Sequence, residues 1–170
     1  MRRGRLARRD VTSSLITTTV FTAIGLSSLP SSAQVPKYRL DKSQTIVVSD
    51  TTLFRMVRVA DGELGGFIGS EENVSQAGTC FAHKDSRVYG NARVLDDAQV
   101  YGEVFGDAII SGKATIVGKA YDHTMVSGEA KIIGEAFGNS VVRGNATVVG
   151  RIYGAAMAAG SEIVLGDRGN

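Results

Sequence analysis

The chain has 170 residues, a formal net charge of +2, 21 glycines and a single cysteine, Cys80. This length suits one domain, and a single cysteine excludes a disulfide within the chain. Residues 1–33 hold five arginines and one aspartate, so a chain without them would carry a formal charge of −2. That balance leaves no basic patch and argues against a nucleic-acid partner.

Residues 1–33 have the three-part layout of a secretory signal peptide. The arginines come first, an uncharged apolar stretch runs from Val11 to Leu29, and small residues at 31–33 precede Gln34. The Arg8-Arg9 pair is typical of twin-arginine export, although general secretion fits as well. A retained N-terminal anchor helix is the other interpretation. We expect cleavage, no transmembrane segment in the remaining chain, and a periplasmic or extracellular location.

Residues 34–77 are expected to form a small N-terminal β cap. They hold strand-like runs at Thr45–Val48 and Leu53–Val59, followed by a polar, glycine-rich stretch. A stack of coils leaves unpaired backbone groups at its end, and a short non-repeating segment usually covers them.

From residue 78 onward the sequence repeats with a period of sixteen. The four clearest blocks begin at Val94, Ile110, Val126 and Val142, and read VLDDAQVYGEVFGDAI, ISGKATIVGKAYDHTM, VSGEAKIIGEAFGNSV and VRGNATVVGRIYGAAM. A degenerate block begins at Gly78 and a partial one at Ala158. A fixed period of this length predicts a solenoid, because each unit is too small to bury its own apolar face. The predicted fold is all-β, a single-stranded β-helix of residues 78–170 with coils of about 16 residues.

Apolar and polar residues alternate within each block, which is the pattern of strands. The spacing of sixteen predicts four inward columns: Ala82, Ala98, Ala114, Ala130, Ala146; Val94, Ile110, Val126, Val142; Val100, Ile116, Ile132, Val148; and Val88, Val104, Ala120, Ala136, Ile152. Cys80 is expected inside the first coil as a small hydrophobic residue. Recurring glycines indicate tight corners, and we expect two six-residue faces and one four-residue face per coil. Outward charges alternate in sign, which favours the correct register, along Arg87, Glu103, Lys119, Glu135 and Arg151.

Two further motifs precede the repeats. LGGFI begins at Leu64 and ENVSQAG at Glu72, and blocks of the VYGNA type follow. Together they resemble the YdcK-like single-stranded β-helix proteins over about residues 64–156. The resemblance implies a left-handed β-helix and no well-established reaction. Two positions depart from the family pattern: Phe81 stands where an aromatic such as Trp is usual, and Lys84 occupies an aliphatic column.

The outward apolar columns are the candidate binding surface. Aromatic residues recur at Tyr89, Phe105, Tyr121, Phe137 and Tyr153. Two further columns contain Ile109, Met125, Val141, Met157 and Tyr101, Val117, Ile133, Val149. Stacked aromatics can simply stabilise a ladder, whereas an exposed apolar strip usually marks a partner surface. We expect a non-catalytic scaffold of the cell envelope that forms a homo-oligomer or binds a glycan or another envelope component.

The alternative is a hexapeptide-repeat acyltransferase, a class that shares the left-handed β-helix and uses a histidine as general base. His123 would be the base, with Asp107 and Asn139 one coil before and after it as orienting partners. A surface imidazole at a turn is the other interpretation of His123. No long loop interrupts the coils to shape an acceptor pocket, and coenzyme A is not normally found outside the cytoplasm. Two dispersed histidines and one cysteine predict no metal site, and we expect no cofactor.

Overall fold

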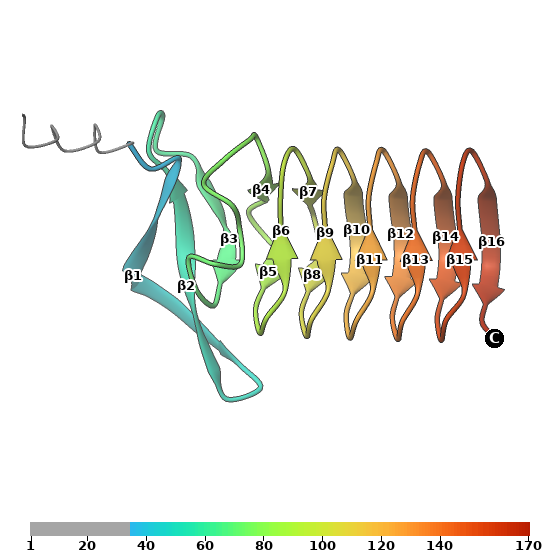
Figure 1. Cartoon of the computed structure of the whole chain (residues 1–170). Helices are drawn as coiled ribbons and strands as arrows, with labels where there is room; N and C mark the ends of the chain where they lie inside the picture. The colour runs from blue at the N-terminus through green and yellow to red at the C-terminus, as the bar shows by residue number, and fades with distance from the viewer. Residues whose placement is uncertain (1–34) are drawn as a thin grey trace, which may run out of the picture. The chain divides into compact units, whose positions relative to one another are not determined.

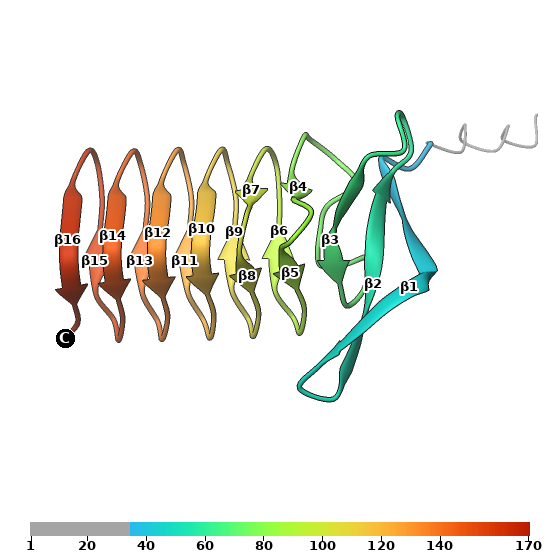
Figure 2. The same ribbon diagram turned by 180° about the vertical axis from the view of Figure 1, so that it is seen from behind.

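A computed structural model describes residues 35–170, and this part of the chain contains strands and no helix (Figure 1). Its parallel sheets form a β-solenoid of about six turns with coils of about 16 residues, so the predicted fold class is confirmed. Figure 2 shows the same stack of coils from behind. The predicted signal peptide, residues 1–33, lies outside the described residues. Residues 35–170 hold no helix that is long and apolar enough to cross a membrane.

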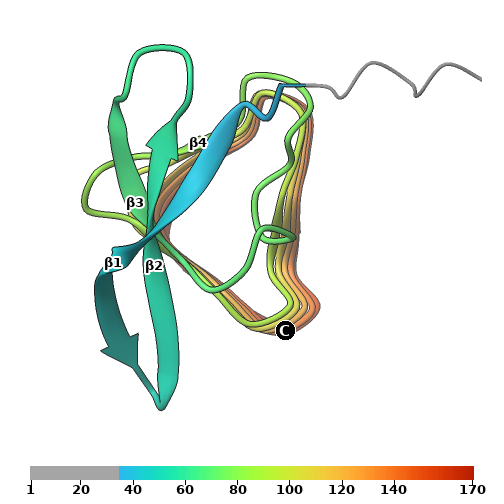
Figure 3. The same cartoon turned by 90° about the vertical axis from the view of Figure 1, so that its left-hand side faces the viewer.

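The N-terminal part is an antiparallel hairpin followed by a third strand. Strand β1 (Tyr38–Val48) pairs with β2 (Thr51–Arg58), and β2 pairs with β3 (Leu64–Ile68), both antiparallel. The predicted strand-like runs fall in β1 and β2, apart from one residue at the end of the second run. Strand β3 then pairs parallel with β5 (Arg87–Val88), so the sheet of the hairpin continues into the coils. Seen along the coils, β1 and β2 cross one side of the coil outline (Figure 3).

Each coil has three faces separated by tight corners. In one coil, β10 (Thr115–Ala120) leads through a turn at 122–123 to β11 (Met125–Val126), and a turn at 128–129 follows. The backbone has positive φ at Gly112, Asp122 and Gly128, and also at Gly118 inside β10, where φ is 136°. These corners delimit faces of six, four and six residues, as predicted. The end view shows the resulting three-sided outline (Figure 3).

The other strands repeat this plan in two sheets. The 11-stranded sheet also contains β4 (Phe81–Ala82), β7 (Gln99–Val100), β8 (Glu103–Val104), β12 (Lys131–Ala136), β14 (Thr147–Ile152) and β16 (Ile163–Arg168). The 5-stranded sheet contains β6 (Arg93–Val94), β9 (Ile109–Ile110), β11, β13 (Val141–Val142) and β15 (Met157–Ala158). From β10 onward, paired residues in the larger sheet are sixteen apart, as in the series Ile116, Ile132, Val148 and Val164.

The predicted inward columns form the core, and all of their residues are fully buried. A fifth buried column, which the sequence pattern did not reveal, lies just before the strands of the smaller sheet. It contains Ala92, Ala108, Thr124, Ser140 and Ala156. The hydroxyls of Thr124 and Ser140 lie within hydrogen-bond reach of each other across the two coils, so the polar atoms in this column are paired.

The first coil departs from the predicted alignment. Ala82 pairs with Val100, so it belongs to the Val100 column, and buried Cys80 takes the place assigned to Ala82 in the alanine column. Arg87 nevertheless pairs with Glu103, sixteen residues on. The chain therefore carries two extra residues between β4 and β5, where Lys84 is exposed. The assignment of Ala82 was wrong because these extra residues shift only the first strand, and they also remove Lys84 from the aliphatic column.

Gly118→Ala and Gly166→Ala make a matched pair, because both glycines have positive φ, 136° and 79°. A Cβ on Gly118 would lie 2.0 Å from the carbonyl oxygen of Gly134, whereas one on Gly166 would meet nothing within 4 Å. Both changes strain the backbone, but only Gly118→Ala also forces two coils apart. We expect its free energy of unfolding, measured in urea, to fall by about 2 kcal/mol more than that of Gly166→Ala. Equal losses would show that close approach of the coils is not why Gly118 is a glycine.

Candidate functional site

The predicted aromatic column is a continuous stack of rings. Between Tyr89 and Phe105 the ring centroids are 5.1 Å apart, and the next three pairs, ending with Tyr153, are separated by 4.9, 5.0 and 5.3 Å. The planes are parallel to within 12°. All five side chains are half-buried. Each ring therefore covers the faces of its neighbours and leaves mainly its edge to solvent.

The position of these rings follows from the coil geometry. Each aromatic residue directly precedes a corner, at Gly90, Gly106, Asp122, Gly138 or Gly154. Consecutive coils are spaced as neighbouring strands are, about 4.8 Å apart, which is close to the contact distance of stacked rings. The Tyr89 hydroxyl donates to the Glu103 carboxylate at 3.1 Å. Burial, followed by the charge of Glu103, raises the pKa of Tyr89 to about 12.

The aliphatic columns are more exposed than the ring stack. Val117, Ile133 and Val149 lie in one column and are 37–40% exposed. The same column begins with Tyr101, whose ring is stacked on His83 with centroids 4.0 Å apart. On the smaller sheet, Met125 and Met157 are about half exposed, while Ile109 and Val141 of the same column are half-buried.

Charged side chains separate the aliphatic column from the ring stack. Glu103 lies between two cations, 4.0 Å from Arg87 and 3.4 Å from Lys119. At the far end, Arg151 forms a two-point ion pair with Asp167, with Nε donating at 3.0 Å. On another face, Lys113 pairs with Glu129 at 3.3 Å. The alternating charges predicted from the sequence therefore form ion pairs between coils, which support the register.

The alternative catalytic residues lie in one column at a corner of the coils. The Nε2 atom of His123 is 3.4 Å from Oδ2 of Asp107, and Asn91 donates to the other oxygen of Asp107 at 2.9 Å. Asn139 makes no side-chain hydrogen bond to His123 among the contacts of residues 35–170. The side chain of His123 is 69% exposed. The structure thus brings His123 and Asp107 together, on an open surface, and leaves Asn139 out.

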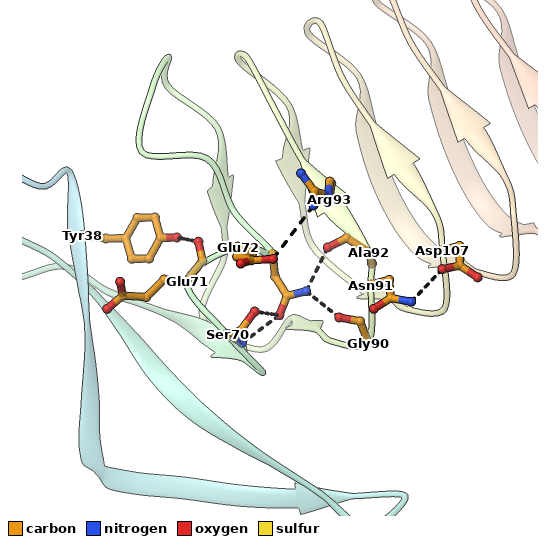
Figure 4. Close-up of polar contacts among 10 residues, drawn as sticks. Tyr38, Ser70, Glu71, Glu72, Gly90, Asn91, Ala92, Arg93 and Asp107 are labelled. Carbon is orange, nitrogen blue, oxygen red and sulfur yellow. Dashed lines mark hydrogen bonds and ion pairs between the residues drawn. The ribbon is translucent and has the colours of Figure 1, made fainter.

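A buried asparagine, Asn73, fixes the start of the solenoid, and sequence reasoning missed it. Its partners Ser70, Gly90 and Ala92 are labelled in Figure 4. The Asn73 amide donates to the carbonyl oxygens of Gly90 at 3.0 Å and Ala92 at 2.9 Å, and its oxygen accepts from the Ser70 N–H at 2.8 Å. Asn73 also lines a small polar cavity with Ser70, Glu72, Gly90, Asn91, Ala92 and Arg93. Since both N–H groups and the oxygen of the amide are used, this residue has a structural role. The ENVSQAG motif was its only signal in the sequence.

A second cavity lies where the hairpin meets the first coil, beside Lys37, Arg58 and Cys80. The Lys37 ammonium group donates to the carbonyl oxygen of Cys80 at 3.0 Å and lies 3.2 Å from its sulfur. The Arg58 guanidinium group lies 4.4 Å from the ring centroid of Phe81 and pairs with Asp61 and Glu63. These cations therefore already have partners in the protein. In the described part of the chain, no group of three or more His, Cys, Asp or Glu side chains could hold a metal ion.

Comparison with known proteins adds no relative. No protein-family model matches the chain, and no curated protein matches it. The coil length and parallel stacking agree with the β-helix that the resemblance implies. Membership of the YdcK-like proteins stays a prediction from the motifs at residues 64–92.

The raised pKa of Tyr89 predicts how stability depends on alkaline pH. The folded protein keeps this phenol protonated up to about pH 12, whereas the unfolded chain loses the proton near the ordinary value of about 10. The contribution of this group is therefore complete below about pH 10 and is lost as the pH rises toward about 12. Urea denaturation across this range should show a smaller fall in stability for Tyr89→Phe than for the unchanged protein. An identical fall in both proteins would contradict the assignment.

Proposed function

We propose that this chain is an exported, non-catalytic β-helix of the cell envelope that acts as a scaffold or interaction protein. Its binding surface is the set of outward apolar columns, and its first partner is a second copy of the same chain packed side by side. The observation that carries this proposal is the regular exposure of large apolar side chains along the coils.

The distribution of polarity around the coil supports a lateral contact. The columns that contain Val117 and Met125 expose aliphatic side chains, whereas the column of Asp97, Lys113 and Glu129 is charged. A soluble rod has no need of regular exposed aliphatic columns, and contiguous apolar surface commonly marks an interface. A face that repeats every coil meets its symmetric copy without further adaptation, which favours self-association.

The ring stack favours a protein partner over a glycan. Sugars bind aromatic side chains through the ring faces, but here the four stacked pairs turn eight of the ten ring faces toward neighbouring rings about 5 Å away. The outward edges of Tyr121 and Phe137 can still pack against apolar side chains. The columns thus offer a partner surface in which the rings supply rigidity and the aliphatic residues supply exposed area.

The lateral contact predicts a change of oligomeric state. The purified protein should self-associate at tens of micromolar in sedimentation velocity, and Val117→Ser combined with Ile133→Ser should abolish association while the far-UV spectrum is unchanged. Lys131→Ser is the matched control, because this exposed residue lies in the same strand as Ile133 but in a polar column. Tyr121→Ser with Phe137→Ser tests the rings separately. A monomer at these concentrations, or association that survives all of these changes, would show that the columns are not the interface.

Export is tested by the N-terminus of the protein recovered from the producing cell. Sequencing should begin near Gln34, and an intact Met1 on material from the envelope would contradict cleavage. Arg8→Lys with Arg9→Lys should block export by the twin-arginine route. Unchanged export of that variant would indicate general secretion instead.

The second candidate function is acyl transfer with His123 as general base, and the 3.4 Å contact with Asp107 is the observation that favours it. A carboxylate beside an imidazole can orient the ring of a general base. The side chain of His123 is 69% exposed, which argues for a surface contact without a catalytic role. We therefore expect no binding of acetyl coenzyme A by calorimetry, and the same stability for His123→Ala as for the unchanged protein. Turnover that is lost in His123→Ala and in Asp107→Asn would establish the enzyme and overturn the scaffold.

A further inference from the structure

We propose that the C-terminal coil binds a second copy of this chain through β16, strand against strand in antiparallel orientation, to give a tail-to-tail dimer. This contact uses the end of the solenoid. It differs from the lateral contact of the proposed function, although Leu165 also ends the column of Val117, and the length of a dimer distinguishes the two contacts.

Within residues 35–170, the outer edge of β16 is unpaired. Strand β16 is the last strand of the larger sheet, and no other strand of residues 35–170 pairs with that edge. In earlier coils the outward residues donate to the following coil, as when Gln99 N bonds to Ala114 O and Tyr101 N to Ile116 O, both at 2.8 Å. The register places Ile163, Leu165 and Asp167 in the equivalent positions of the last coil. Their backbone N–H and C=O groups therefore point to the open end, in the manner of any unpaired edge strand.

The side chains of β16 also lack the cover that coils give one another. In one column, Val149 is 39% exposed, but Leu165, the next residue along it, is 75% exposed. A Cβ on Gly150 would lie 2.2 Å from the Gly166 carbonyl oxygen, whereas a Cβ on Gly166 would meet nothing within 4 Å. A further strand against β16 would cover Leu165 as each coil covers the one before it.

The smaller sheet is closed at the same end. Arg168 reaches across the last coil and donates to the carbonyl oxygen of Met157 in β15 at 2.9 Å, while it pairs with Glu162 at 2.6 Å. The side chain of Asn170 accepts from Ala155 N at 2.6 Å. These contacts occupy backbone groups near β15 and leave β16 as the edge that can accept a strand.

The other end of the solenoid is a poor partner for β16. The pairing of β1 shifts register between Asp41 and Thr45, and the Asp41 carboxylate accepts from Ser43 N and Gln44 Nε2, each at 3.0 Å. Irregular edges that carry charge resist strand addition. Head-to-tail association through β1 is therefore disfavoured, and a second β16 is the matching edge.

Two copies of β16 complement each other in one antiparallel register. If Leu165 lies opposite its own copy, Ile163 faces Asp167 of the second copy, and inward Val164 faces inward Gly166. The three outward residues then exchange about six backbone hydrogen bonds with the second copy. In this register Glu162, which pairs with Arg168 of its own chain, also faces Arg168 of the second copy, so charges of opposite sign lie together on both sides of the twofold axis.

Leu165→Cys tests this geometry by disulfide trapping. In a hydrogen-bonded antiparallel pair the two Cα atoms lie about 5.5 Å apart, which is within disulfide range. The native Cys80 is fully buried and gives little background. We expect most of the Leu165→Cys protein to form a disulfide-linked dimer under mild oxidation, and small-angle scattering of that dimer to show a long dimension close to twice that of the monomer.

Two controls separate this contact from the lateral one. Lys131→Cys reports random collision, and Val117→Cys reports the side columns. Trapping of Leu165→Cys well above the Lys131→Cys level, in a dimer close to twice as long as the monomer, supports the end contact. Trapping no faster than Lys131→Cys, or a trapped dimer no longer than the monomer, would overturn it. Trapping of Val117→Cys alone would support the side-by-side scaffold and reject the tail-to-tail dimer.

Discussion

The close approach of backbone to backbone at the corners of consecutive coils is the constraint on which this structure depends. At Gly118, Gly134 and Gly150 a Cβ would lie within 2.2 Å of the carbonyl oxygen of the next coil. Such contacts allow only glycine, and they hold the coils one strand spacing apart. A change in coil length would move glycine away from this point, so the corners also fix the period at sixteen residues. The columns of the core and of the surface follow from that period.

Columns give this surface a particular chemistry, because the nearest outward neighbour of each residue is its own equivalent in the next coil. Rings meet rings and cover each other's faces, and alternating charges pair. His123 meets Asp107 for the same reason. A site that needs several different groups around one cavity is hard to build from such repeats. The residues best placed for specific recognition are therefore those of the exposed aliphatic columns and of the two ends of the solenoid.

The sequence predicted the parts of the structure that repeat, and it failed where the repeat is interrupted. Cys80 was correctly expected inside the first coil, but Ala82 was placed in the wrong column because the two extra residues near Lys84 leave the local pattern unchanged. The buried column of Thr124 and Ser140 was not predicted, because their mutual contact, across sixteen positions, has no signal in either block. The spacing brought His123 near both Asp107 and Asn139, but spacing does not determine the rotamer, and only Asp107 is in contact.

The two ends of the solenoid differ in how their unpaired strand edges are covered. At the N-terminal end the parallel stack passes into antiparallel strands through β3, and the last edge, β1, is irregular and charged. At the C-terminal end Arg168 and Asn170 bind backbone groups beside the smaller sheet, while β16 keeps a regular edge beneath exposed Leu165. A regular edge strand is normally covered or made irregular. Because only the β16 end keeps such an edge, the two ends of the solenoid differ in their capacity to pair with a further strand. The β1 edge is interrupted by a register shift, whereas β16 presents the same kind of edge that each earlier coil presents to the next.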